Sequence, residues 1–539
     1  MKRILPILLF SILGFSIYLL QFSLWWLVVT FIIAGLCIVY IYDVSQNKHA
    51  LLKNFPILGH GRYIADWMRP KIYQYFVEPD TGGRPITRID RSVIYQRAKN
   101  TVDTTPFGTQ YDVYEEGYEW MSHSIKPVPH ALINYNPRVK VGGKDCTQPY
   151  ESSLLNVSAM SFGSLSGAAI EALNGGAALG GFAHNTGEGG LSDHHLKNGG
   201  DIIFQFGTGY FGVRDLAGNF SDERFALLTA NPQIKMIEIK LSQGAKPGHG
   251  GILPASKATP EIAKIRHIEP YKEVVSPAYH TAFDTPREMV KFIGKCRELS
   301  GGKPVGFKLC VGQEYEFVAI CKAMVAEGIL PDFITVDGGE GGTGAAPLEF
   351  SNSVGMPLYE GLSFVYNTLI GFNIKKQITL FASGKITNGF HIFKSIALGA
   401  DGCNSARGMM MALGCIQALE CNKNTCPTGV ATQDPDLVKG LDVTDKKLRV
   451  FHFQKNTIKS FVELMSAAGL SHYDQINRSH IFKRVAMNRS KRYDQLYPYV
   501  VEGCLLAEST VPREMKNAWF NASPDSFHPR FTQVFIEED

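Results

Sequence analysis

Eight short apolar segments, each ending in small or polar residues, repeat through the middle of this 539-residue sequence. Helical patterns such as TPREMVKFIGKCREL and EFVAICKAMVAEG lie between them. Strands that alternate with helices predict a parallel sheet. Eight such units predict an α/β fold of the closed (β/α)8 type, the TIM barrel. The expected strands are the segments 154–161, 180–186, 201–207, 236–244, 304–310, 333–339, 378–384 and 401–408.

The polar residues stand at the C-terminal ends of these expected strands, where barrel enzymes place their active sites. The stretches ASGKI and GCNSARG follow the seventh and eighth strands. Small residues there let backbone N–H groups and a helix N-terminus hold a phosphate. Together with Lys308 at the end of the fifth strand, they predict a phosphorylated cofactor such as FMN.

The N-terminal segment has a different character, because residues 4–42 contain no charged side chain. A bilayer core of roughly 30 Å needs about 20 apolar residues per helix. The segment therefore predicts a transmembrane helical hairpin that turns at residues 21–23, with Trp25 and Trp26 as interfacial anchors. One long tilted span and a cleaved signal peptide remain alternatives.

Basic residues flank this apolar segment on both sides and predict a two-pass membrane protein whose catalytic domain faces the cytoplasm. They are Lys2, Arg3, Lys48, Lys53 and Arg62. We expect a transmembrane hairpin over 1–43, an irregular collar over 44–150, the barrel over 151–475 and a C-terminal extension over 476–539. The net charge of +4 is small, and we find no basic stripe interleaved with aromatic residues, so we expect no nucleic-acid partner.

Ten cysteines are spread along the chain, and most stand alone inside apolar segments. That pattern indicates reduced thiols rather than a secreted disulfide framework. Only Cys415, Cys421 and Cys426 are clustered, with the spacing C-x5-C-x4-C.

Four stretches carry a resemblance to a known family: NTGEGG (185–190), QGAKPGHGG (243–251), DGGEGGTGAAP (337–347) and CNKNTCPTGVATQ (421–433). In this order they resemble the synthase domain of glutamate synthases, and the similar region covers residues 150–470. The chain also resembles the stand-alone, membrane-attached FMN-binding glutamate synthase family. This resemblance implies an FMN-binding barrel and a three-cysteine [3Fe-4S] cluster.

The clustered cysteines match the cluster loop of those synthases, which implies Cys415, Cys421 and Cys426 as iron ligands. Three thiolates suit a cubane that lacks one corner iron. A zinc site would need a fourth ligand, and none stands at suitable spacing. Zinc and purely structural cysteines remain the alternatives.

The resemblance also assigns the remaining site residues. For the flavin ring and ribityl chain it implies Ala159, Met160, Ser161, Asn185, Thr186, Gln205 and Lys308. For the phosphate it implies Gly338, Gly339, Gly384, Lys385, Asn404, Ser405 and Arg407. The residues implied to bind or orient a 2-oxo acid and its imine are Glu188, Lys240, Gln243 and Lys246. Simpler interpretations remain open, with Lys240 as a strand-end charge and Glu188 as a turn cap.

The implied activity is that of a glutamate synthase-like oxidoreductase acting on CH–NH2 donors. It would reduce a 2-imino acid, formed from a 2-oxo acid such as 2-oxoglutarate and ammonia, to an amino acid such as glutamate. We expect neither an amidotransferase nor a dinucleotide-binding domain, so electrons would come from an external donor such as ferredoxin or a reductase subunit. The alternatives are an FMN and iron–sulfur oxidoreductase with another substrate, and a non-enzymatic membrane-tethered redox relay.

Several positions depart from the family pattern close to the expected site. His249 stands where the family has a carboxylate, and Tyr210 stands where it has an arginine. Phe204 replaces a lysine, and residues 404–407 replace a glycine-containing phosphate loop. These changes leave the barrel prediction intact and put the identity of the substrate in question.

Overall fold

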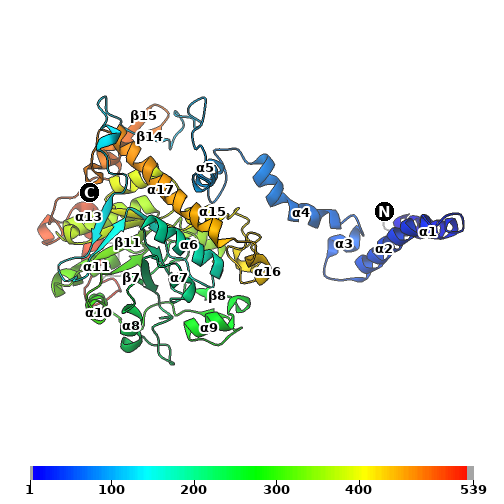
Figure 1. Ribbon diagram of the computed structural model, residues 1–539, viewed down its shortest axis with the longest axis horizontal. Helices are drawn as coiled ribbons and strands as arrows, with labels where there is room; N and C mark the ends of the chain where they lie inside the picture. Colours follow the sequence, from blue (N-terminus) through cyan, green and yellow to red (C-terminus); the bar gives the residue numbers. More distant parts are fainter. Residues whose placement is uncertain (1–3, 531–539) are drawn as a thin grey trace. The chain divides into compact units, whose positions relative to one another are not determined.

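The structure is a computed structural model that describes residues 4–530 (Figure 1). The chain divides into two compact units, Met1–Ile89 and Asp90–Asp539. The second unit contains a closed barrel of eight parallel strands, in which β10 pairs with β7 and closes the ring. Its strands are β4 (Leu155–Val157), β5 (His184–Asn185), β6 (Ile202–Phe206), β7 (Ile234–Lys240), β10 (Val305–Leu309), β11 (Phe333–Asp337), β12 (Thr379–Ser383) and β13 (Gly402–Ser405).

The predicted TIM barrel is confirmed. Seven of the eight strands lie inside the segments predicted for them, and β7 begins at Ile234, two residues earlier than expected. The barrel strands β6, β7, β10, β11, β12 and β13 are buried along their whole length, apart from one partly exposed residue near the start of β7. This burial explains why they read as nearly continuous apolar runs, since helices cover the outer face of such a sheet.

Helices follow the strands and cover the barrel in the second unit. They include α6 (Gly167–Gly180), α8 (Asp222–Thr229), α10 (Pro286–Leu299), α11 (Glu314–Glu327), α13 (Leu358–Gly371), α14 (Gly389–Ala397) and α15 (Arg407–Leu413). The long helix α17 (Val443–Ala467) runs alongside α6 (Figure 1). Gly176 allows this close approach, because a Cβ atom there would lie 2.6 Å from the Val450 side chain.

Local sequence signals explain where several of these helices begin and end. Ser166 begins α6, and its side chain accepts a hydrogen bond from the Ala169 N–H. Thr285 does the same for α10, where Pro286 occupies the first helical position. Such caps satisfy N–H groups that have no partner inside the helix. The helix α11 ends at Gly328, whose φ of 67° suits a residue without a side chain.

The first unit contains two apolar helices, α1 (Ile4–Leu19) and α2 (Trp26–Ser45). Thr30 in α2 donates a hydrogen bond to Ser16 in α1 at 3.1 Å. Among residues 4–530, α2 is the one helix long and apolar enough to cross a membrane, with a mean hydropathy of 2.3, and α1 is shorter. The apolar segment therefore supplies a candidate span, and the two-pass topology stays a prediction.

The region between the apolar helices and the barrel is more regular than the sequence indicates. It contains α3 (Ala50–Asn54), α4 (His60–Ile72) with a continuing π-helical turn at Tyr73–Val77, and α5 (Arg88–Ala98). A strand, β1 (Glu119–Met121), pairs with β14 (Ile481–Ala486) of the C-terminal region, which also pairs with β15 (Arg489–Arg492). Because its partner lies so far along the chain, β1 gives no local hairpin signal.

A buried ion pair stabilises the end of the barrel where the strands begin. A hairpin of β2 (Arg138–Val141) and β3 (Tyr150–Ser153) leads into β4, and its turn residue Gly143 donates to Asp332 at 2.7 Å. Asp332 also accepts hydrogen bonds from Val305 N at 2.8 Å and Arg297 Nε at 2.9 Å. The carboxylate of Asp332 is 1% exposed, so its charge depends on these donors.

This pair predicts a large loss of stability in the variant Arg297→Met. The substitution leaves the Asp332 carboxylate buried without its cation, which costs about 3–5 kcal/mol of unfolding free energy. The matched control, Lys439→Met, removes a surface ion pair with Asp436 and should cost at most about 1 kcal/mol. Thermal unfolding of detergent-purified protein measures both, and equal melting temperatures for the two variants would contradict the assignment.

Candidate active site

A buried carboxylate organises the inside of the barrel. Glu238 on β7 is 1% exposed. Its oxygens accept hydrogen bonds from Asn185 Nδ2 at 2.7 Å, Gln205 Nε2 at 2.5 Å and Thr335 Oγ1 at 2.6 Å. A carboxylate removed from water needs such donors. Asn185 and Gln205, both predicted to contact the flavin, are therefore held in place by a residue that the sequence does not single out.

The predicted lysine of the fifth strand joins this network. Lys308 Nζ lies 3.0 Å from Asp337 Oδ2. Burial would lower the pKa of Lys308, but Asp337 and Glu238 outweigh it and raise the pKa above its usual value. Lys308 therefore remains a buried cation. Asp337 also accepts a hydrogen bond from Gly244 N at 3.0 Å, which ties the loop after β7 to the end of β11.

An acceptor without a partner lies at the same rim of the barrel. The strand register places Asp337, Ser383 and Asn404 side by side at the ends of β11, β12 and β13. Within the described part of the chain, the buried Oδ1 of Asn404 has no hydrogen-bond partner. A buried amide oxygen without a donor is uncommon and indicates a missing ligand group. Asn404 is one of the residues predicted to bind the phosphate of the cofactor.

A cluster of charges forms where β5 and β7 end. Lys240, the last residue of β7, places its Nζ 2.7 Å from Glu188 Oε1. Two glycines leave room for the carboxylate, since a Cβ at Gly207 would lie 2.4 Å from Glu188 Oε2 and one at Gly251 would lie 2.7 Å from Oε1. Burial would raise the pKa of Glu188, but Lys240, followed by Arg266 and Lys246, holds it below its usual value.

The two other cations of this cluster are also buried. Lys246 donates from Nζ to the Ala345 carbonyl at 2.9 Å, and burial together with Lys240 lowers its pKa. Arg266 ends α9 (Pro260–Arg266) and donates to the Phe162 carbonyl at 3.0 Å. Burial lowers the pKa of Arg266 to about 10, so it stays charged at neutral pH. Its Nε has no hydrogen-bond partner among the residues that the structure describes.

The loop from Lys240 to Lys246 carries the remaining predicted catalytic residue, the partly buried Gln243. The loop is pinned across the barrel rim, because Ser242 Oγ donates to the Cys310 carbonyl at 3.2 Å. His249, further along, contacts its own loop through a 2.9 Å Nδ1 interaction with the Gly250 carbonyl.

Tyr210 and His280 form a chain of hydrogen bonds that ends at the carbonyl of Lys240, the last residue of β7. His280 Nε2 lies 2.8 Å from the Lys240 carbonyl, and its Nδ1 lies 3.1 Å from Tyr210 Oη. Burial lowers the pKa of His280 to about 4, so the ring is neutral at pH 7. A carbonyl can only accept, so Nε2 donates to Lys240 and Nδ1 accepts the Tyr210 hydroxyl proton. Tyr210 Oη in turn accepts from Ala282 N at 3.0 Å.

The loops after β4 and β5 bring the other predicted flavin residues together. Met160 and Ser161 are almost fully buried, and a Cβ at Gly187 would lie 2.8 Å from Ser161 N. Thr186 Oγ1 accepts a hydrogen bond from Gln205 N at 3.0 Å. Ala159 precedes Met160 in the same loop and is partly exposed. These contacts place the loop after β4 beside the loop that bears Glu188.

The residues predicted for the phosphate separate into two groups. The N–H groups of Gly338 and Gly339 donate to the Ser383 and Met356 carbonyls, each at 2.8 Å, so they are already used. The Glu340 carboxylate adjoins Gly338 and accepts from Leu358 N at 2.9 Å.

The second group lies after β12 and β13, and its assignment to the phosphate stays a prediction. It consists of Gly384, Lys385, Asn404, Ser405 and Arg407. The guanidinium of Arg407 donates to the Glu340 carbonyl at 2.5 Å. Ser405 Oγ donates to the Ile386 carbonyl at 2.6 Å and so joins the two loops.

This donor set fits an anionic cofactor that carries N–H and O–H groups. Lys308 supplies buried positive charge at the rim, and Arg407 supplies partly buried positive charge. Asn404 Oδ1 offers an unused acceptor within the described residues. FMN has both a phosphate and hydrogen-bond donors, so the residues present fit FMN.

The cysteine loop is folded around Asn424, whose φ is 61°. Asn424 accepts hydrogen bonds from Thr432 Oγ1 and from Gln433 N, each at 2.7 Å. Gln433 Nε2 then donates to the Leu165 carbonyl at 2.8 Å. The run after Cys426 thus attaches the loop to the segment after β4, where Met160 and Ser161 lie.

The three thiols are close enough to influence one another. Burial, followed by Cys421 and Cys426, raises the pKa of Cys415 to about 11. For Cys426, burial would raise the pKa, but hydrogen bonds from the Ala431 and Thr428 groups hold it below its usual value. Lys257 Nζ donates to the Cys421 carbonyl at 2.9 Å and adds positive charge beside the thiols.

The cysteine loop does not form a site for a single metal ion within the described residues. Between residues 4 and 530, no three His, Cys, Asp or Glu side chains are close enough together to hold one metal ion. The thiolates of an iron–sulfur cluster bind different iron atoms, so they stand farther apart. Three thiols in one loop are ligands of the type that such a cluster uses, and the cluster itself stays a prediction.

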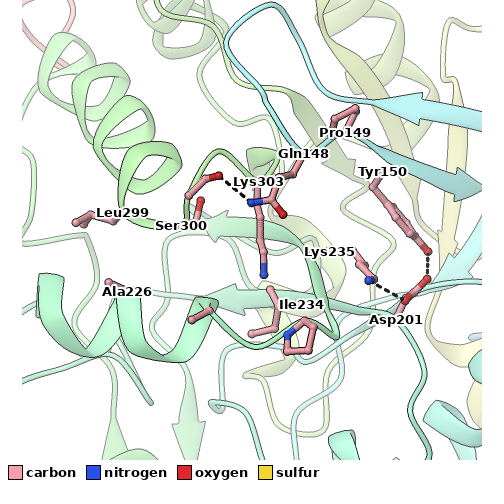
Figure 2. Close-up of a pocket in the computed structure, with 13 residues that line it drawn as sticks. Gln148, Pro149, Tyr150, Asp201, Ala226, Ile234, Lys235, Leu299, Ser300 and Lys303 are labelled. Carbon is pink, nitrogen blue, oxygen red and sulfur yellow. Dashed lines mark hydrogen bonds and ion pairs between the residues drawn. The ribbon is translucent and has the colours of Figure 1, made fainter.

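A separate cavity of about 820 Å3 opens at the other end of the barrel, where the strands begin (Figure 2). Its polar groups are paired with protein atoms. Asp201 accepts from Tyr150 Oη at 2.9 Å and lies 3.8 Å from Lys235 Nζ. Lys303 Nζ donates to the Thr229 and Asn231 carbonyls. Barrel enzymes carry their chemistry at the opposite end, so the cavity is not the candidate active site.

Sequence reasoning missed several residues of this site: Glu238, Asp337, Arg266 and Lys257. Glu238 lies in the middle of an apolar strand. Asp337 ends β11 and opens the motif DGGEGGTGAAP, but the resemblance assigns it no role, and Arg266 and Lys257 lie outside every expected strand. Arg266 and Lys257 come from a helical insertion after β7. A charged residue inside the run MIEIK was the one available signal, because such a position is expected to be apolar.

Comparisons with known proteins agree with the geometry. Residues 105–471 match the family described as a conserved region in glutamate synthase. The glutamate synthase large subunit-like protein YerD of Bacillus subtilis (strain 168) is 38% identical over 487 residues, covering 83% of this chain and 92% of that protein. An archaeal glutamate synthase (NADPH) of Methanocaldococcus jannaschii is 33% identical over 309 residues, covering 57% of each chain.

The matched region contains the barrel strands, the Glu188–Lys240 pair and the cysteine loop. It spans more than half of the chain, and the similarity to YerD extends over most of both proteins. The chain therefore belongs to the glutamate synthase family, and its barrel is the conserved glutamate synthase region.

Proposed function

We propose that this chain is an FMN-dependent oxidoreductase that reduces a 2-imino acid to an amino acid, with 2-oxoglutarate, ammonia and glutamate as the leading case. One observation carries the proposal. Lys240, Lys246 and Arg266 surround the single carboxylate of Glu188, which leaves an excess of positive charge at the barrel rim. A dianionic 2-oxo dicarboxylic acid complements such a site.

Each charged residue then has a distinct task. Arg266 is buried with its Nε unpartnered in the described structure, and a guanidinium binds a carboxylate through two parallel hydrogen bonds. Lys246 and Lys240 would pair with the second carboxylate and polarise the 2-oxo group. Glu188 remains ionised, so it would accept N–H hydrogen bonds from ammonia or the imine.

Cofactor binding would use the rim residues that fit FMN. Lys308, Asn404 and Arg407 would hold the flavin, while Cys415, Cys421 and Cys426 would hold a [3Fe-4S] cluster. Bound FMN would supply a hydride, and the cluster would pass on electrons from an external donor such as ferredoxin or a reductase subunit. Asn185 and Gln205 keep the floor of the site fixed through Glu238.

The first unit would attach the protein to a membrane. The helix α2 would cross the membrane, and α1 would make the second pass. The basic residues on both flanks of the apolar segment would keep the barrel on the cytoplasmic side.

The first test records an absorption spectrum of detergent-purified protein before and after 2-oxoglutarate and ammonia are added to photoreduced enzyme. We expect flavin bands with an iron–sulfur shoulder, and reoxidation when both compounds are present. The same spectrum without reoxidation would favour a different substrate, as the Tyr210 and His249 substitutions suggest. Protein that contains neither flavin nor iron would contradict the proposal.

The variant Lys240→Met should lower the rate of substrate-dependent reoxidation by about 100-fold or more, because the polarising cation is lost. Lys240 is the main charge that lowers the pKa of Glu188. That pKa should therefore rise, and the acid limb of any residual pH–rate profile should move to higher pH. The matched control, Lys235→Met, removes a lysine from the other end of the same strand and should keep the wild-type rate. Equal rates for the two variants would contradict the assigned role.

The variant Cys421→Ser should lose cluster iron and keep the flavin, because it removes one thiolate and leaves the barrel rim intact. Iron analysis and the visible spectrum measure both cofactors in the same sample. Cys504→Ser alters a buried cysteine of the C-terminal region and should retain its iron. Full iron content in Cys421→Ser would rule out this thiol as a ligand.

A further inference from the structure

The helix α4 has one apolar face and one polar face. Its sequence, HGRYIADWMRPKI, places five apolar residues at the spacing that brings them onto one side of a helix. These residues are Tyr63, Ile64, Trp67, Met68 and Ile72. Arg62, Asp66 and Arg69 recur on the opposite side. The pattern is that of an amphipathic helix rather than a solvated linker.

The apolar face of α4 is exposed. Trp67 is 66% exposed and Ile64 is 57% exposed, and every other apolar residue of this face is also exposed. The exposure continues through the π-helical turn Tyr73–Val77, where Phe76 is 85% exposed. A continuous surface of aromatic and aliphatic side chains is unfavourable in water and marks a binding face.

The first residue of α4 is held at the end of α2. Asp43, near the C-terminus of α2, is fully buried. Its carboxylate lies 2.9 Å from His60 Nε2 and accepts a hydrogen bond from Ile57 N at 2.8 Å. Since α2 is the candidate membrane span, this tie starts α4 where that span would leave the hydrocarbon core.

The charges of this segment suit anionic lipid. Residues 60–77 contain the cations Arg62, Arg69 and Lys71 and one carboxylate, Asp66. Lys71 Nζ lies 3.9 Å from the centre of the Trp67 ring. A lysine that folds over a tryptophan keeps its charge at the headgroups while the ring enters the boundary region. Basic charge together with Trp and Tyr is typical of helices that lie in the interface plane.

We propose that α4 and the turn Tyr73–Val77 form an interfacial helix that lies on an anionic membrane surface. The apolar face enters the boundary between headgroups and acyl chains, and the basic residues contact lipid phosphates. The occupant of the face is lipid, because the helix continues from a candidate span and carries excess positive charge. The inference is independent of the proposed reaction and would stand if the enzyme used another substrate.

The test uses full-length protein reconstituted in phosphatidylcholine vesicles with and without phosphatidylglycerol. Bromine-labelled lipids quench tryptophan emission at the depth of the label. The variant Trp67→Phe should lose part of the quenched emission, most strongly with bromine close to the headgroups. The matched control Trp120→Phe removes a ring stacked on Phe482 in the second unit and should leave the quenched emission unchanged.

Two outcomes would overturn the proposal. If Trp67→Phe leaves the quenching unchanged while the tryptophans at 25 and 26 are quenched, lipid does not cover the face. If no tryptophan is quenched, the first unit is not in the membrane. For the electrostatic part, Arg69→Glu with Lys71→Glu should abolish any increase in Trp67 quenching caused by phosphatidylglycerol. An unchanged increase would show that these charges do not contact the lipid.

Discussion

The negative charge of Glu238 has to be balanced inside the barrel, and the strands that form the active site meet around it. Asn185 of β5, Gln205 of β6 and Thr335 of β11 bond directly to this carboxylate, and Lys308 of β10 adds positive charge. The network joins five neighbouring strands below the rim. In a low-dielectric interior each group fixes the next, so the side chains predicted to contact the flavin have little freedom. Such rigid support is what a precise catalytic geometry needs.

The sequence predicts the barrel well because each strand carries its own local signal, an apolar run followed by small or polar residues. It predicts the interior network poorly, because the partners of Glu238 are three separate strands that become neighbours only on closure. Arg266 illustrates the same limit. It lies in a helical insertion, and its proximity to Glu188 follows from tertiary folding alone. The sequence does not predict the pairing of β1 with β14 for the same reason.

The glycines after the strands show how one residue type serves two physical purposes. Glycine after a strand indicates a phosphate site because its backbone can approach a ligand closely. Gly339 instead allows approach between two parts of the protein, since a Cβ there would lie 2.5 Å from the Gly355 carbonyl. The N–H of Gly339 donates to the Met356 carbonyl and is not free for a phosphate. Positive charge from Arg407 therefore becomes more important for binding a phosphate at the rim. The replacement of a glycine-containing loop by residues 404–407 is consistent with that exchange.

Tyr210 raises the question of how the site's charge is set. The family pattern has a cation at this position, whereas Tyr210 is buried. Its hydroxyl donates to His280 and accepts from the Ala282 N–H. His280 is neutral at pH 7, so the chain of bonds that holds the Lys240 carbonyl adds no charge. The positive charge around Glu188 therefore comes from Lys240, Lys246 and Arg266. Because Coulomb energies act over several ångströms in a poorly solvated site, removing one cation changes which anions bind well. Under the proposed function, the absence of a cation at Tyr210 would bear on whether a dicarboxylic or a monocarboxylic 2-oxo acid binds.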